Sequence, residues 1–78
     1  MTVNSFENIA EIIRFHRKLA RLTQAELAEL SGVGKTVVFD LEKGKMSVQL
    51  DTLLKVITAL NIEIVFKSPL LEQNHEKS

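Results

Sequence analysis

The sequence has no cysteine, tryptophan or tyrosine, one proline and three glycines among 78 residues. Without cysteine, and with only the distant His16 and His75 as histidines, a disulfide framework and a Cys/His zinc site are excluded. No apolar run approaches the ~20 residues that span a bilayer, and the N-terminus lacks a signal-peptide pattern. So short a chain has little room for a walled catalytic cleft. We therefore expect a small cytoplasmic binding module, not an enzyme, with no metal, cofactor or membrane partner.

Charge is balanced overall but not along the chain. Ten basic and ten acidic residues cancel, which argues against a nonspecific polycation. Residues 14–45, however, hold seven basic and four acidic residues, a local charge of +3, and the other positions carry −3. This segregation matters only if the basic side chains share one face, and simple scatter is the alternative.

The first half of the chain predicts two helices. Residues 6–20 show helical spacing, with basic residues between the apolar ones. Thr23-Gln-Ala-Glu26 has the form of a capping box and predicts a second helix. That helix should end near Ser31, because Gly32 can adopt the left-handed conformation that closes a helix. The apolar positions of the first helix are Phe6, Ile9, Ile13 and Ala20.

Two further helices are predicted in the second half. The third begins at Gly34 or Lys35 and runs to about Lys43, with Gly44 as its stop signal. The fourth covers about residues 49–60, and Asn61 stands where a left-handed C-terminal residue is expected. The apolar stripe of this fourth helix comprises Leu50, Leu53, Leu54, Ile57 and Leu60.

After the fourth helix the period changes from helical to alternating. Residues 62–67 predict a strand, and Pro69 prevents its continuation. One strand cannot satisfy its own backbone groups, so we expect a homodimer closed by a two-stranded antiparallel ribbon. The alternative is that 62–67 extends the last helix. Residues 1–67 then form one domain and 68–78 a flexible tail. The strand side chains expected on one face are Ile62, Ile64 and Phe66.

Residues 23–43 have the layout of a helix-turn-helix. Two short helices that cross steeply need a small residue where they touch, and Ala28 supplies it. The tight turn needs a residue that tolerates positive φ, which Gly32 provides, and Val33 is expected beneath the turn. The side chains expected to point from both helices toward one core are Leu27, Val38 and Leu41.

The run LTQAELAELSGVGKTVVFDLEKGK resembles the Cro/CI-type helix-turn-helix repressors, also called the XRE family, and the resemblance covers about residues 6–60. It implies an all-α, lambda-repressor-like domain of four or five helices that binds a palindromic operator as a dimer. The segment SVQLDTLLKVITALNIEIVF resembles more narrowly the HipB type of antitoxin, in which a C-terminal strand pairs across the dimer. That likeness implies a repressor that autoregulates its operon and binds a HipA-like kinase toxin.

The resemblance also implies base-reading positions on the third helix. Lys35 has a physical argument of its own, since a cation in the first turn opposes the helix dipole unless it meets a base edge or a phosphate. Phe39 departs from the family pattern and either packs on a thymine methyl or completes the core. Asp40 also departs from it, because a carboxylate accepts from cytosine N4 but repels phosphate. The positions implied for base readout are Lys35, Thr36, Val37, Phe39 and Asp40.

Other roles follow from the same resemblance. A buried ion pair between Arg17 and Glu42 would tie the first helix to the end of the third, and two unconnected surface charges are the alternative. Thr23, Gln24, Lys43 and Lys45 fall on phosphate-contacting places, with Arg14 and Arg21 as possible additions.

The sequence leaves three other functions to consider. Gly32-Val-Gly-Lys-Thr36 looks like the end of a phosphate-binding P-loop, but Glu29 occupies the place of the first glycine. A protein-interaction module that neutralises a toxin is the main competitor, with Phe15 as a candidate contact. A phage-type or restriction-system controller without a toxin partner is the third possibility.

Overall fold

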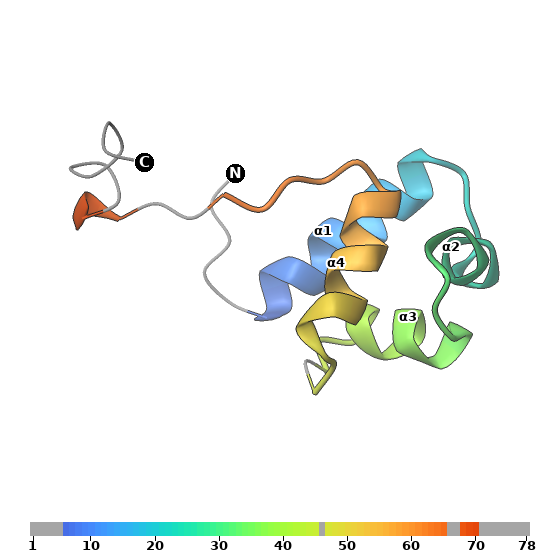
Figure 1. The fold of residues 1–78 in the computed structure, drawn as a ribbon. Helices are drawn as coiled ribbons and strands as arrows, with labels where there is room; N and C mark the ends of the chain where they lie inside the picture. The colour runs from blue at the N-terminus through green and yellow to red at the C-terminus, as the bar shows by residue number, and fades with distance from the viewer. Residues whose placement is uncertain (1–5, 46, 66–67, 71–78) are drawn as a thin grey trace.

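The computed structural model describes residues 6–45, 47–65 and 68–70. In these residues the chain is all-α and contains no strand. In Figure 1, α1 and α4 cross in the middle of the molecule, α3 lies below them and α2 lies at the right. The four predicted helices are present with ends within about one residue of the prediction. They are α1 (Phe6–Leu19), α2 (Gln24–Ser31), α3 (Lys35–Glu42) and α4 (Leu50–Ala59).

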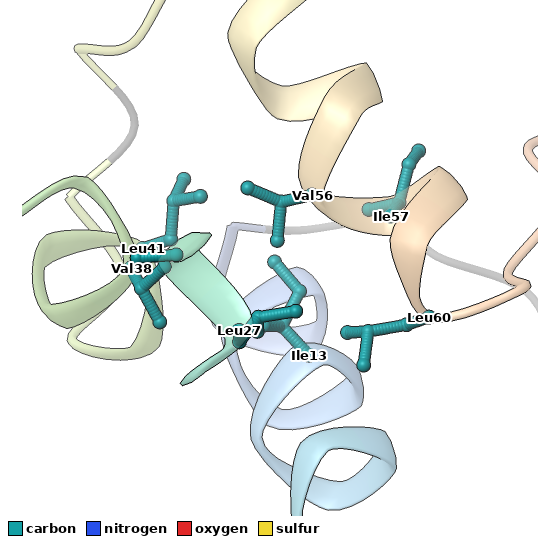
Figure 2. Packing of buried hydrophobic residues seen from close by; sticks show 8 residues of the cluster. Ile13, Leu27, Val38, Leu41, Val56, Ile57 and Leu60 are labelled. Atoms are coloured by element: carbon teal, nitrogen blue, oxygen red, sulfur yellow. The ribbon is translucent and has the colours of Figure 1, made fainter. Parts of the chain in front are cut away.

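One apolar cluster joins the four helices (Figure 2). Ile13 from α1 and Leu27 from α2 have no exposed surface, and neither do Val38, Leu41 and Val56. Removing a side chain of this size from water contributes about 1.5–3 kcal/mol. The whole cluster consists of Ile13, Leu27, Ala28, Val38, Leu41, Val56, Ile57 and Leu60. Because α2 and α3 give half of these residues, folding of the core fixes the orientation of the predicted helix-turn-helix.

The apolar stripe of α4 differs from its prediction. Ile57 and Leu60 are buried as expected, but Leu50 and Leu54 are exposed. Val56, which was not in the predicted stripe, is fully buried. The helix is apolar on two adjoining faces, and helical period alone cannot say which of them meets α1 and α2.

The first helix also ends slightly earlier than predicted. Ala20 was expected on its apolar stripe, but the residue lies in the turn after α1 and is exposed. The turn is closed by Arg21, which adopts a left-handed conformation with φ 59°. The correction shortens the core-facing stripe of α1 to its central turns.

The alternative of a longer last helix is wrong for the described residues, because α4 ends at Ala59 and Asn61 has the expected left-handed φ of 59°. Residues 62–65 have no regular structure in the single chain. Ile62 packs against the core, whereas Ile64 is exposed. Pairing with a second copy stays a prediction; Phe66, and the tail after Leu70, lie outside the described residues.

Candidate nucleic-acid interface

The turn between α2 and α3 has the geometry that the sequence predicts. Gly32 lies at φ 75°, and Val33 N donates to the Ala28 carbonyl over 3.0 Å. A Cβ on Gly32 would meet no heavy atom within 4 Å, so the backbone angle, not lack of space, demands glycine. Ala28 is buried and Val33 half-buried against the core. The turn therefore sets α3 at a fixed angle to α2.

The capping box at the start of α2 is formed in both directions. Thr23 Oγ1 accepts from Glu26 N over 3.0 Å, and Thr23 N donates to Glu26 Oε1 over 2.8 Å. These bonds satisfy two backbone groups that a helix start otherwise leaves unpaired. The Thr23 hydroxyl thus has a structural role in addition to the phosphate contact predicted for it.

Helix α3 presents most of the predicted base-reading positions to solvent. Val38 and Leu41 hold its inner face in the core, and Lys35, Thr36 and Phe39 are exposed. Val37 is only half exposed because it packs against the core cluster. The other position, Asp40, is half-buried at the margin of the exposed face.

The structure excludes one of the two alternatives for Phe39, which is that its side chain completes the core. Its side chain is 42% exposed and is not part of the core cluster. Lys43 Nζ lies 4.5 Å from the centroid of its ring. A cation–π contact at an exposed site contributes about 0.5–1 kcal/mol, so it orients both side chains without locking them. Phe39 is therefore a surface side chain on the outer face of α3.

Asp40 is not an isolated carboxylate on this surface. Lys45 Nζ lies 3.9 Å from Asp40 Oδ1, and Lys45 N donates to the Asp40 carbonyl over 3.0 Å. The chain after α3 folds back over the helix end and places a cation beside the acid. Exposed pairs of this kind contribute about 0–1 kcal/mol, but the nearby charge reduces repulsion of an approaching phosphate.

Arg17 and Glu42 form the predicted ion pair. Arg17 Nε and Nη2 donate to Glu42 Oε2 and Oε1 over 2.6 and 2.9 Å, and Arg17 Nη1 donates to the Leu22 carbonyl over 2.8 Å. The two side chains are 12% and 4% exposed. The hydrogen bond to Glu42 raises the pKa of the Arg17 guanidinium, and burial opposes this rise. The pair joins α1 to the last residue of α3.

Gln24 belongs to the same network, which the sequence reading missed. Its Nε2 donates to Glu42 Oε1 over 3.2 Å, so one carboxylate receives bonds from α1 and from α2. Gln24 was predicted only as a phosphate contact, and its amide nitrogen is engaged inside the protein. Gln24 and Glu42 lie 18 residues apart, and no pattern in the sequence relates them. Only the folded structure brings the two side chains together.

Comparison with known proteins places this arrangement in a family. A family profile described as helix-turn-helix matches residues 13–67. The chain is 36% identical to the control protein C.SmaI of Serratia marcescens over 58 residues, covering 74% of this chain and 69% of the relative. It is 37% identical over 62 residues to an uncharacterized HTH-type transcriptional regulator, y4mF, of Sinorhizobium fredii, covering 80% and 82%. This chain belongs to the helix-turn-helix family of DNA-binding transcriptional regulators.

The fold of this helix-turn-helix protein is also found among solved structures. A chain in the structure of a HipA-HipB-O2-O3 complex superposes with a TM-score of 0.78 over 88% of this chain and 97% of that chain. Sequence identity is 20%, so the likeness establishes the fold alone. It agrees with the predicted lambda-repressor-like domain.

The other residues predicted to contact phosphate lie on the surface of the helix-turn-helix protein. Arg14 on α1 and Arg21 in the following turn are exposed, as are Thr23, Lys43 and Lys45. Of the predicted set, Lys43 and Lys45 lie directly beside the outer face of α3, through their contacts with Phe39 and Asp40. The local basic excess of the sequence is thus partly gathered at the end of α3.

The described residues do not form a P-loop, a cluster of metal ligands or a membrane-spanning helix. The P-loop-like segment Gly32–Thr36 forms the helix-turn-helix turn and follows a helix, whereas a P-loop follows a strand. Within residues 6–45, 47–65 and 68–70, no three His, Asp or Glu side chains gather as metal ligands. None of the helices described is both long and apolar enough to cross a membrane.

Proposed function

We propose that this protein is a sequence-specific repressor that binds a palindromic operator as a homodimer. The observation that carries the proposal is the outer face of α3, which is exposed while its inner face is fixed in the core and its end is tied to α1. A helix held in this way fits the major groove and reads base edges without ordering itself on binding.

The outer face of α3 gives each side chain a distinct task. Lys35 is suited to the O6/N7 edge of guanine or to a phosphate, and Thr36 to a phosphate or a thymine methyl. Phe39 offers an apolar surface for a thymine methyl. Asp40 accepts from cytosine N4 where the operator provides it. Val37, half-buried, contributes apolar contact at the margin of the reading surface.

Phosphate contacts position this surface on the duplex. The amides at the start of α2, next to Thr23 and Gln24, form a seat for an anion. Lys43 and Lys45 hold the backbone beside the end of α3, and Arg14 and Arg21 extend the contact toward α1. These contacts supply affinity without sequence preference.

Dimerisation is supported by an apolar hollow beside α4. Its side chains come from α4 and from the segment after it, and several are exposed. We propose that a second copy covers this hollow while residues 62–67 of the two copies pair as a ribbon. A symmetric dimer places its two α3 helices about 34 Å apart, one turn of DNA. The hollow is lined by Leu50, Leu54, Ile57, Thr58, Ile62, Glu63 and Ile64.

Two kinds of operon are candidates for regulation by this repressor. The likeness in fold to a chain of a HipA-HipB complex supports an autoregulating antitoxin that binds a HipA-like kinase toxin in the bacterial cytoplasm. The identity with a control protein supports the second candidate, a restriction-system controller without a toxin. Both candidates use the same α3 surface on DNA.

A footprint on the promoter of its own gene tests the proposal. We expect protection of two half-sites about one helical turn apart on one side of the duplex. Lys35→Ala should abolish this protection, while Lys55→Ala, a change of an exposed lysine on α4, should preserve it. Protection that survives Lys35→Ala on every sequence would contradict base reading by α3.

A further inference from the structure

Three neighbouring side chains form one patch on the outer face of α3. Thr36 precedes Phe39 by three residues and Asp40 by four, and residues with these spacings are neighbours on a helix surface. Thr36 and Phe39 are exposed, and the Asp40 side chain is 38% exposed. This patch, here called the α3 reading patch, joins the methyl group of Thr36 and an aromatic ring to a carboxylate.

The ring and the carboxylate of the patch are each oriented by a lysine that follows α3. Lys43 Nζ lies 4.5 Å from the centroid of the Phe39 ring, which nevertheless stays 42% exposed. Lys45 Nζ lies 3.9 Å from Asp40 Oδ1, which is longer than a hydrogen bond, so the carboxylate can still accept from a base. Groups that are oriented before DNA arrives lose little conformational freedom on binding.

The backbone after α3 places these two lysines. Lys43 N and Lys45 N both donate to the Asp40 carbonyl, over 3.1 and 3.0 Å. Gly44 between them has a left-handed φ of 85°, which turns the chain back over the end of the helix. The α3 reading patch and the two cations beside it are therefore one local arrangement.

No unmodified base offers the complement of this patch. Guanine presents two acceptors in the major groove, which repel a carboxylate, and thymine sets its methyl group beside the O4 acceptor. Adenine sets its N6 donor beside the N7 acceptor, and cytosine has the N4 donor without a methyl group. A methyl group on C5 of cytosine supplies the missing apolar group, on the ring atom next to the one that carries N4.

We propose that the α3 reading patch recognises 5-methylcytosine. Asp40 accepts from the N4 amino group, and the Phe39 ring and the Thr36 methyl group pack on the C5 methyl. The inference rests on the proposed binding of operator DNA and names a base within it. The thymine methyl assigned to Phe39 and the cytosine N4 assigned to Asp40 belong to two bases in unmodified DNA and to one base in methylated DNA.

Two versions of the promoter of its own gene provide the probe, one unmodified and one with 5-methylcytosine at every cytosine. The full chain is titrated against both in a mobility-shift assay. Burial of one methyl group against an apolar surface raises affinity about four-fold, so two half-sites should favour the methylated fragment by about ten-fold or more. Duplexes with a single 5-methylcytosine should then locate the gain at one cytosine in each half-site.

Variants of the full chain identify the side chains. Phe39→Ala should abolish the preference for the methylated fragment. Leu30→Ala, which removes an apolar side chain that is 61% exposed on α2, is the matched control and should keep that preference.

Thymine in place of the located 5-methylcytosine tests the carboxylate, because it keeps the methyl group and exchanges the N4 donor for the O4 acceptor. This exchange should weaken binding by the unmodified protein about ten-fold or more. Asp40→Asn should relieve the loss, because a carboxamide can donate to O4. A loss of the same size in Asp40→Asn would contradict the role of Asp40.

Three results would overturn the inference. The first is equal affinity for the two promoter fragments, and the second is a methylation gain that persists in Phe39→Ala. The third is a thymine whose replacement by uracil weakens binding by the unmodified protein but not by Phe39→Ala, which would assign the ring to that thymine. No binding of either fragment would refute the proposed function, and the inference with it.

Discussion

The ion pair between α1 and α3 makes the most direct prediction. Glu42→Ala removes the acceptor of three hydrogen bonds, two from Arg17 and one from Gln24. The Arg17 side chain, which is 12% exposed in the unmodified protein, then keeps the Leu22 carbonyl as its remaining partner. Breaking one half of a buried pair costs about 3–5 kcal/mol, and the low end applies because Arg17 keeps that one bond.

A loss of about 3 kcal/mol is large for a domain of this size. It should lower the melting temperature by roughly 12–24 °C, at 4–8 °C per kcal/mol. The assay is thermal unfolding followed by circular dichroism at one fixed protein concentration, because the proposed dimerisation would make the transition concentration-dependent. Glu29→Ala, a change of an exposed acid on α2, is the control and should melt like the unmodified protein.

The stability that Arg17 contributes through this contact should not change with pH near neutrality. The pKa of Arg17 is raised in the folded state by its hydrogen bond to Glu42. A base with a raised pKa stabilises the fold fully below its unfolded pKa and loses that contribution only as the pH rises through the folded value. For an arginine this loss lies far above neutrality, so Arg17 should add no pH dependence between about pH 6 and 9.

Two results would refute this reasoning about the ion pair. One is a Glu42→Ala melt within about 2 °C of the unmodified protein, which would mean that the contact adds no stability. The other concerns the double variant Arg17→Met/Glu42→Met, which should be less destabilised than the sum of the two single variants, because it leaves no unpaired buried charge. A destabilisation equal to that sum would contradict the pairing.

Three further predictions concern the cap, the phosphate contacts and the dimer. Thr23→Ala removes the capping box and should cost about 1 kcal/mol, measured in the same melts. Lys43→Ala and Lys45→Ala should weaken binding equally on all operator sequences and flatten the salt dependence by about one unit per lost contact; a loss confined to particular sequences would contradict the assignment. Ile64→Pro should convert the proposed dimer to a monomer in sedimentation, and a variant that still sediments as a dimer would exclude ribbon pairing.

The helices and their ends were readable from local chemistry. Thr23 with Glu26, Gly32 and Asn61 each act within one turn of the chain, and the structure places all of them as predicted. Caps and left-handed residues depend on neighbours a few positions away, which is why the sequence alone locates them.

The sequence predicted less well which apolar side chains are buried, because burial depends on residues far apart in the chain. Leu50 and Leu54 share the helical period of the buried residues of α4 but face outward, because α1 and α2 pack against the side that carries Val56. The sequence also left Phe39 open between core and surface, and the packing of Val38 and Leu41 decided it. Apolar periodicity marks a face that can be buried and does not say what buries it.

By itself the sequence determined the helix boundaries, the helix-turn-helix and the resemblance that placed Arg17 opposite Glu42. Only the tertiary structure decided which apolar faces are covered and that Gln24 bonds to Glu42. It also decided that Lys43 contacts the Phe39 ring and that Lys45 lies beside Asp40. The physical reason is the distance along the sequence between the residues that interact. Backbone angles and caps are fixed by adjacent residues, whereas burial and charge pairing are fixed by whichever helix the folded chain brings alongside.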